Sequence, residues 1–200
     1  MPKIVDHGQQ RECFAAAVIR LVARGGLEGM TMRAVAAEAG LSYGSLFHYF
    51  PSKDELLMEA VRYSTSLQTR RVNAYSSRYR GLKALEQLLF DDALADGDSR
   101  GDAVVWLAFS YKAALEPRFA AMHSELIDGW LERIEQLLNE ALERGEIAAD
   151  TDTALEALAV WAYSAGVGQQ GLLYPARLPP QRQRKLITVY LQRLRPQPSP

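Results

Sequence analysis

Four side chains that can do recognition chemistry stand close together in the stretch "YGSLFHYF", residues 43–50. In the major groove of DNA, Phe47 can contact a thymine methyl group and Tyr43 can donate or accept a hydrogen bond at a base edge. His48 and Tyr49 can bond to phosphate oxygens, which positions a protein on a duplex without reading its sequence. The chemistry that this stretch favours is therefore DNA recognition.

The alternative is that these aromatic residues only pack the core of a small helical bundle. We adopt that interpretation for Leu46 and Phe50, which fall on the opposite side of the predicted helix. For Tyr43 and His48 we expect exposure, because a helix this short cannot bury all its sides. Lys53, just beyond the stretch, is a further candidate for a phosphate contact.

Enzyme chemistry has little support in the sequence. The three histidines, His7, His48 and His123, are scattered, and no metal-ligand spacing or nucleophile–base pair accompanies them. "GVGQQG", Gly166–Gly171, matches the pattern of dinucleotide-binding loops, but no strand precedes it and no acid follows Glu156. We expect no catalytic residue, no metal and no cofactor, and we interpret these glycines as sites of close helix packing.

The elements that must position the first stretch are two short helices and a turn. Thr31 is a suitable N-cap for one helix and Ser42 for the next, with Gly40 between them to take a left-handed conformation. Pro51 ends the second helix, and Ser52 with Glu55 forms a capping box for a long third helix. This order predicts a helix-turn-helix. The predicted DNA-binding residues are Thr31, Arg33, Ser42, Tyr43, Gly44, Ser45, Phe47, His48, Tyr49 and Lys53.

Helical periodicity extends over nearly all of the remaining chain, so the predicted fold is all-α with about nine helices. We expect a DNA-binding domain over residues 1–52, a ligand-binding and dimerisation domain over 53–195, and a disordered tail over 196–200. "LADGDSRGD", residues 94–102, is the clearest internal loop. The apolar segment 154–173, with residues 181–194, predicts a four-helix dimer interface.

Composition sets further bounds. The net charge of −1 means that nucleic-acid binding must rest on a local surface. The single Cys13 excludes an intramolecular disulfide framework, and its place in an apolar helical pattern predicts a buried thiol. The polar start and the lack of a long apolar run predict a cytoplasmic protein with no membrane partner.

The three tryptophans all lie beyond the helix-turn-helix, on separate predicted helices. Aromatic walls suit flat apolar ligands, and they attract cations through the ring quadrupole. Nearby carboxylates at Glu116, Glu125 and Asp128 can neutralise a cation. We therefore expect a small-molecule inducer that is an amine, another cation or a flat apolar compound. The alternative for each side chain is ordinary core packing. The predicted ligand-binding residues are Trp106, Phe109, Phe119, Met122, His123, Trp130 and Trp161.

The stretch "TMRAVAAEAGLSYGSLFHYFPSKDELL" resembles the N-terminal domain of TetR-type transcriptional regulators. The matching positions are Thr31, Val35-Ala36, Ala39-Gly40-Leu41-Ser42, Gly44, Leu46 to Phe50, Lys53 and Leu56. Phe47 departs from the pattern, since tyrosine is commoner there. The C-terminal part is similar to the BetI-like branch.

The resemblance implies a homodimer whose C-terminal domains bind an inducer and whose N-terminal domains bind a palindromic DNA operator. We expect a repressor that the inducer releases from that operator. Two alternatives remain at this point: an enzyme within the helical C-terminal domain, and a partner-binding adaptor on a helix-turn-helix scaffold.

Overall fold

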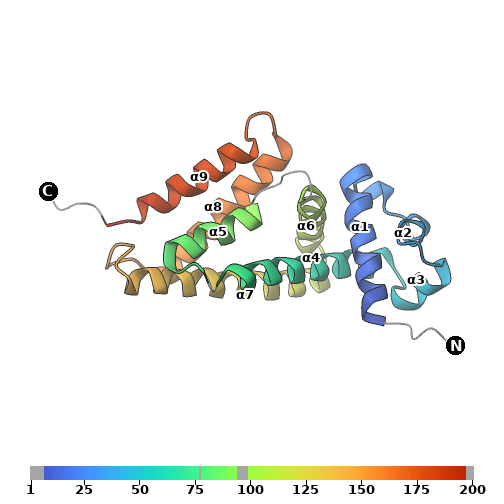
Figure 1. Cartoon of the computed structure of the whole chain (residues 1–200). Helices are drawn as coiled ribbons and strands as arrows, with labels where there is room; N and C mark the ends of the chain where they lie inside the picture. The colour runs from blue at the N-terminus through green and yellow to red at the C-terminus, as the bar shows by residue number, and fades with distance from the viewer. Residues whose placement is uncertain (1–6, 77, 94–98, 197–200) are drawn as a thin grey trace. The chain divides into compact units, whose positions relative to one another are not determined.

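The computed structural model describes residues 7–76, 78–93 and 99–196, which form nine α-helices and no strand (Figure 1). The predicted all-α fold is confirmed. Within the described ranges, no helix is both long and apolar enough to cross a membrane. The helices are α1 (His7–Gly29), α2 (Met32–Glu38), α3 (Tyr43–Tyr49), α4 (Lys53–Ser76), α5 (Gly81–Ala93), α6 (Arg100–Ala113), α7 (Pro117–Glu143), α8 (Thr153–Leu173) and α9 (Pro180–Arg193).

The chain packs as two compact units. The first comprises residues 1–67 and 98–121, and the second comprises residues 68–97 and 122–200. The first unit thus contains α1–α3, α6, most of α4 and the start of α7. The predicted domains are a division by function, and they stay a prediction. Of the predicted tail, all but Pro196 lies outside the described residues.

The predicted loop over residues 94–102 is shorter than expected. Residues 94–98 lie outside the described part of the chain, and α6 already begins at Arg100. Asp102 lies in the first turn of α6, where a carboxylate interacts favourably with the helix dipole. A glycine- and aspartate-rich stretch therefore starts a helix here instead of extending a loop.

The core of the first unit is built on α1. Phe14, Ala17, Val18 and Val22 are buried at the spacing of one helix face. Near its end α1 is interrupted by Gly26, which is non-helical with φ 64°. A tight contact joins α1 to α6, since a Cβ on Gly101 would lie 2.7 Å from the backbone oxygen of Ile19.

The prediction that Cys13 is a buried thiol is wrong, because Cys13 is exposed. It directly precedes Phe14 on α1, and successive residues of an α-helix are rotated by about 100°. The apolar pattern around Cys13 belongs to the neighbouring face, which packs inward while Cys13 faces solvent.

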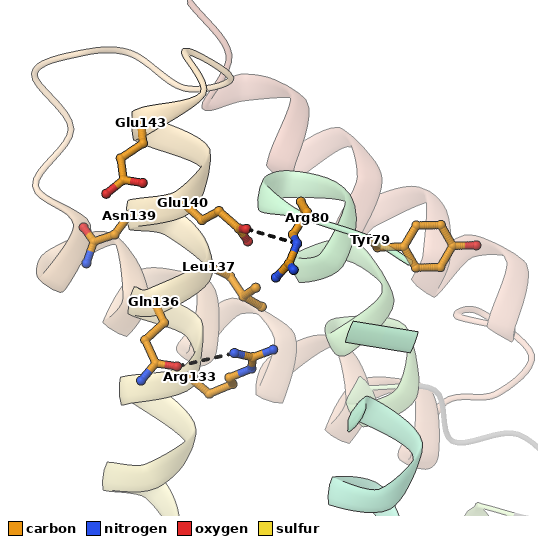
Figure 2. Close-up of a pocket in the computed structure, with 8 residues that line it drawn as sticks. All are labelled: Tyr79, Arg80, Arg133, Gln136, Leu137, Asn139, Glu140 and Glu143. Carbon is orange, nitrogen blue, oxygen red and sulfur yellow. Dashed lines mark hydrogen bonds and ion pairs between the residues drawn. The ribbon is translucent and has the colours of Figure 1, made fainter. Parts of the chain in front are cut away.

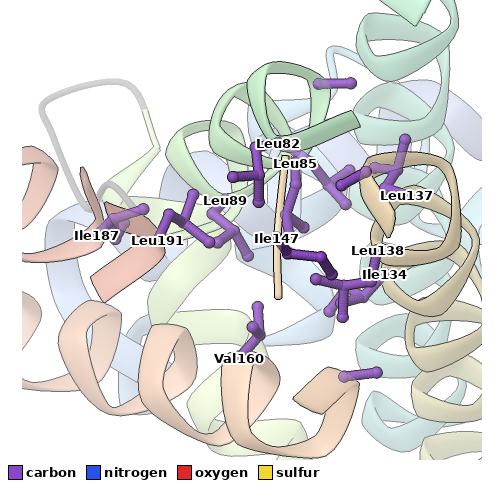
Figure 3. Packing of buried hydrophobic residues seen from close by; sticks show 14 of the residues in the cluster. Leu82, Leu85, Leu89, Ile134, Leu137, Leu138, Ile147, Val160, Ile187 and Leu191 are labelled. Carbon is purple, nitrogen blue, oxygen red and sulfur yellow. The ribbon is translucent and has the colours of Figure 1, made fainter. Parts of the chain in front are cut away.

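The core of the second unit joins α5, α7, α8 and α9. Leu85 and Leu89 of α5 pack with Ile134 of α7, Val160 of α8 and Ile187 of α9 in one buried cluster (Figure 3). Because α5 contacts both α8 and α9, leucines on different sides of α5 can all pack in this cluster.

Two glutamates bind the first turn of α5 to the end of α7. Glu140 Oε2 accepts from the Gly81 N–H at 3.0 Å, and Glu146 Oε2 accepts from the Leu82 N–H at 2.8 Å. These carboxylates satisfy backbone donors that no helical residue can reach. Burial acts to raise the pKa of Glu146, but the Arg144 guanidinium and the Leu82 N–H outweigh it and hold the pKa below its ordinary value.

Candidate nucleic-acid interface and ligand-binding residues

Both predicted N-caps of the helix-turn-helix are formed. Thr31 Oγ1 accepts from the Ala34 N–H at 3.1 Å, at the start of α2. Ser42 Oγ accepts from the Ser45 N–H at 3.0 Å, at the start of α3. Each bond satisfies one orphan donor of a helix that is only two turns long, so the side-chain caps help to set where α2 and α3 begin.

The turn between the helices depends on Gly40. Its φ is +67°, a left-handed conformation that glycine adopts without the steric cost of a Cβ. The Leu41 N–H then donates to the Ala36 carbonyl at 3.0 Å, which closes the end of α2. At the other end of α3, Phe50 is extended with φ −136°, as expected for a residue before a proline. The predicted helix-turn-helix is confirmed.

The two sides of α3 differ as predicted. Leu46 and Phe50 are buried, while Tyr43 is 46% and Phe47 54% exposed. The rings of Tyr43 and Phe47 stack with their centroids 6.3 Å apart and their planes at 29°. They form one outward-facing aromatic surface that we call the α3 ledge. Its atoms include a phenol hydroxyl beside apolar ring carbon, so it offers both a hydrogen bond and an apolar contact.

The polar groups at the end of α3 are arranged around Tyr49. His48 is exposed, and its ring meets that of Tyr49 edge-on at 5.4 Å between centroids. Tyr49 is half-buried, and its hydroxyl lies 2.5 Å from Nδ1 of His7 at the start of α1. Sequence reasoning missed His7 as the partner of this hydroxyl. The phosphate contact assigned to Tyr49 stays a prediction, and it would have to share the hydroxyl with His7.

Ser45, like Tyr49, contacts a side chain of α1. It is half-buried, and its hydroxyl donates to Gln10 Oε1 at 3.3 Å. A Cβ on Gly44 would meet only Ser42 Oγ, at 4.0 Å, so the backbone of α3 is open to a close approach there. The remaining predicted residues are exposed: Thr31, Arg33, Ser42 and Lys53.

Ion pairs that the sequence did not reveal hold α2 against α1. Arg20 Nε lies 2.7 Å from Glu38 Oε1, and Arg24 pairs with the other oxygen of Glu38. Hydrogen bonds from Arg20 and Arg24 hold the pKa of Glu38 below its ordinary value. A second pair joins α1 to α4, where Arg11 donates to both carboxylate oxygens of Glu59 at 3.1 and 2.6 Å. Such fork-shaped pairs add geometric precision to the placement of the helix-turn-helix.

Three of the predicted ligand-binding residues come together in the first unit. Phe109 and Phe119 are fully buried, with ring centroids 5.7 Å apart, and Trp106 approaches Phe109 at the same distance. The ammonium group of Lys112 lies 4.9 Å from the Phe119 ring centroid. Lys112 also pairs with Glu116 at 2.9 Å, so this predicted partner of a cationic ligand already neutralises a side chain of the protein.

The other four predicted ligand-binding residues belong to the second unit. Met122 is buried, and burial lowers the pKa of the half-buried His123. Trp130 and Trp161 are half-buried and pack against the core of α5, α7, α8 and α9. Their grouping in one pocket with the first three stays a prediction.

A surface hollow of about 360 Å³ lies in the second unit, along α7 and the residues that precede α5. Figure 2 shows Arg80 reaching from the residues before α5 toward α7, which carries Arg133 and Leu137. Its lining carries acids and bases together, and none of the seven predicted ligand-binding residues contributes to it. It therefore adds no support to the predicted aromatic site. The lining residues are Tyr79, Arg80, Arg133, Gln136, Leu137, Asn139, Glu140 and Glu143.

Both the N-terminal and the C-terminal part of the chain match known protein families. Residues 15–60 match the family described as bacterial regulatory proteins, tetR family, and residues 82–196 match the family described as BetI-type transcriptional repressor, C-terminal. The transcriptional regulator PksA of Bacillus subtilis (strain 168) is 29% identical over 194 residues, covering 96% of this chain and 93% of that protein. The regulator BetI of Agrobacterium fabrum (strain C58) is 31% identical over 119 residues, covering 56% of this chain and 55% of that protein.

A solved structure shows the same fold at lower identity. It is a putative transcriptional regulator from Saccharomonospora viridis in complex with choline, with a TM-score of 0.82 and 23% identity, covering 93% of this chain and 97% of that one. The BetI-type match spans more than half of the chain and the tetR match includes the whole helix-turn-helix. The chain belongs to the TetR family of bacterial transcriptional regulators and carries a BetI-type C-terminal region.

Proposed function

We propose that the chain acts as a homodimeric repressor that binds a palindromic operator through α3 and leaves it when a small molecule binds. The observation that carries this proposal is the α3 ledge. Tyr43 and Phe47 remain exposed on a helix whose opposite side, at Leu46 and Phe50, is buried. An N-terminal segment of a recognition helix is the part that reaches base edges in the major groove.

The residues around the ledge divide into two roles. Phe47 contacts a thymine methyl group and Tyr43 bonds to a base edge, so both contribute to sequence preference. Lys53 and Arg33, both exposed, contact phosphates, which adds affinity without sequence preference. The remaining predicted residues lie next to the bound duplex around α3. They are Thr31, Ser42, Gly44, Ser45, His48 and Tyr49.

The homodimer is supported by an exposed apolar surface on α8 and α9. Leu155 is 64%, Leu158 47% and Leu173 50% exposed in the single chain, and Leu186 and Val189 of α9 are exposed as well. Aliphatic side chains at such exposure on neighbouring helices mark an interface. Pairing with a second copy covers these side chains in a four-helix bundle. It also provides two α3 helices, one for each half-site of a palindrome.

The inducer is proposed to be an amine, another cation or a flat apolar compound, bound among the predicted aromatic residues. Phe109 and Phe119 with Trp106 supply aromatic surface, and Trp130 and Trp161 supply two further indole rings. Aromatic faces attract cations. The structurally similar regulator from Saccharomonospora viridis holds the quaternary cation choline, which agrees with this ligand class.

Release requires the ligand to bind one conformation of the dimer better than the other. A differential of about 3 kcal/mol changes operator affinity by roughly 150-fold. Such a ligand needs no contact with α3.

Selection of DNA fragments by the purified protein, followed by sequencing, tests the proposal. We expect an enriched palindrome with half-site centres about 34–36 Å apart, or modestly more. A protein carrying both Tyr43→Ala and Phe47→Ala is the control, and it should retain DNA without enriching that palindrome. Recovery of fragments with no common sequence by the unaltered protein would contradict the proposal.

A further inference from the structure

The start of α1 lies beside α3 in the first unit. His7 Nδ1 is 2.5 Å from the Tyr49 hydroxyl. One turn further along α1, Gln10 Oε1 accepts from the Ser45 hydroxyl at 3.3 Å. The two α1 residues are three positions apart and the two α3 residues are four apart, so each pair shares one face of its helix. These two contacts fix the start of α1 along one side of the proposed recognition helix.

Tyr49 is held at its ring as well as at its hydroxyl. Its ring centroid lies 6.2 Å from that of the buried Phe14 and 6.3 Å from that of the buried Phe50. The rings of His7 and His48, both exposed, approach it edge-on with centroids at 5.7 and 5.4 Å. Two exposed imidazoles therefore adjoin one half-buried tyrosine, and the bond to the hydroxyl comes from His7.

The charged side chains that act on this group from the described residues belong to α1 and α4. They are Arg11, Lys53, Glu55 and Glu59. Arg11 already holds Glu59 with two hydrogen bonds, at 3.1 and 2.6 Å. No acid lies in the first turn of α1 or within α3. Asp6, which precedes His7 in the sequence, lies outside the described residues. A positive charge on His7 therefore faces no carboxylate from the two helix segments that form the contact.

The hydrogen of the bond between His7 and Tyr49 decides what the hydroxyl can offer to DNA. A neutral imidazole carries one N–H, and when that hydrogen is on Nε2, the bare Nδ1 accepts the phenol hydrogen. The Tyr49 oxygen then has no hydrogen for a second acceptor. A protonated imidazole carries N–H on both nitrogens, so Nδ1 donates to the phenol oxygen and the phenol hydrogen is released. Protonation thus makes this hydrogen available to phosphate oxygens, which only accept.

We propose that His7 is a positioning residue for DNA binding, which acts on phosphate through the Tyr49 hydroxyl and is most effective when protonated. The inference rests on the proposed operator binding and adds a residue of α1 and a response to pH. Histidine is the side chain that ordinarily changes its charge between pH 5 and pH 8. A phosphate beside the pair favours the charged imidazole, so binding of DNA takes up a proton at His7.

Titration of the full-length protein with its selected operator, at pH 6 and at pH 8 in the same salt, tests the inference. Affinity should be about tenfold higher at pH 6, because a hydrogen bond that involves a charged group is about twice as strong as a neutral one. Random DNA should show a similar gain, since phosphate contacts carry no sequence information. The salt slope should be steeper at pH 6, because each added positive charge releases a further counterion.

Two substitutions of His7 separate its hydrogen bond from its charge. Asparagine places an amide atom where Nδ1 stands, so His7→Asn keeps a partner for Tyr49 but takes up no proton. Its gain between pH 8 and pH 6 should fall to about threefold or less. His7→Arg has a fixed positive charge, and it should bind at pH 8 about as tightly as the unaltered protein binds at pH 6. Tyr49→Phe removes the hydroxyl and should reduce the gain.

His48→Asn is the matched substitution, because it changes the other exposed imidazole that adjoins Tyr49. It should weaken DNA binding at both pH values and keep most of the gain. Circular dichroism at each pH checks that the variants are folded, and His7→Arg provides an independent result if His7→Asn loses helix.

The outcomes separate the two proposals. Equal operator affinity at pH 6 and pH 8 overturns the role of His7 and leaves operator binding standing. The same holds for a gain that His7→Asn retains and His48→Asn loses. A protein that binds no DNA at either pH overturns both proposals.

Discussion

The α3 ledge and the exposed stripe of α8 both leave large hydrophobic side chains in solvent, at similar fractional exposure. We define the stripe by the exposed apolar residues of α8, which include Leu155, Leu158, Ala162, Ala165 and Leu173. They differ in the atoms that they present. The ledge is a pair of stacked aromatic rings with a hydroxyl, beside the exposed Ser42, His48 and Lys53. The stripe of α8 presents leucine and alanine side chains, which offer no hydrogen bond.

Exposure alone therefore does not identify the partner of a surface. A mixed aromatic and polar surface on a two-turn helix suits base edges and phosphates, which require both apolar contact and hydrogen bonds. An aliphatic stripe along a 21-residue helix suits another aliphatic surface, because only burial of apolar area can stabilise its contacts. Substitutions in each region should therefore affect different measurements.

The largest effect is expected at the α8 stripe. Leu158→Glu should weaken dimerisation by about 100-fold or more, because it removes two buried leucines per dimer and places two carboxylates in an apolar interface. Sedimentation equilibrium measures the change. Leu115→Glu is the control, since Leu115 is more exposed in the single chain than Leu158, at 65% against 47%, but lies outside α8 and α9. An equal loss for both variants would remove the distinction between the stripe and any other exposed leucine.

At the α3 ledge, Phe47→Ala should weaken operator binding by about tenfold and leave random DNA almost unaffected, since a base contact contributes about 1–3 kcal/mol of discrimination. Tyr43→Ala should relax base preference at its own position.

Lys53→Ala should weaken binding to operator and to random DNA alike and reduce the salt slope by about one unit. Binding titrations at several salt concentrations separate these results, and equal losses on both DNAs for the ledge variants would refute the assigned roles.

Trp130→Ala should weaken inducer binding by about tenfold, because a lost aromatic face removes both apolar contact and attraction for a cation. The change is followed by tryptophan fluorescence during titration with amines and with flat aromatic compounds. Tyr111→Ala is the control, since Tyr111 is 68% exposed and outside the predicted site. Unchanged inducer affinity and operator release in the Trp130 variant would show that the ligand binds elsewhere.

The smallest expected effect involves neither surface. It concerns how the stability of the second unit depends on pH. The lowered pKa of Glu146 means that its contribution to stability is present above pH of about 4.3, the ordinary value, and is lost as pH falls through the lowered value. Urea unfolding should therefore show a loss of stability from this group as the pH falls from 5 to 3. Glu146→Gln should show a correspondingly smaller loss, whereas the exposed Glu143→Gln should behave as the unaltered protein does.

Local features of the helix-turn-helix could be predicted from the sequence because their causes lie within four residues. The caps at Thr31 and Ser42 bond to the N–H three residues on, and Gly40 needs only its own lack of a Cβ. The burial of Leu46 and Phe50 followed from their side of a short helix. For the same reason the family could be inferred from one short stretch, since that stretch contains both the scaffold and the recognition surface.

The tertiary structure decided what depends on residues far apart in the chain. The partner of Tyr49 is His7, 42 residues away, and the pairs of Glu38 come from an earlier helix. The exposure of Cys13 depends on which face of α1 packs against other helices. The apolar pattern of the sequence alone does not determine that face. Periodicity determines that a helix has an apolar side, but side-chain partners depend on how helices pack, and packing is a property of the whole fold.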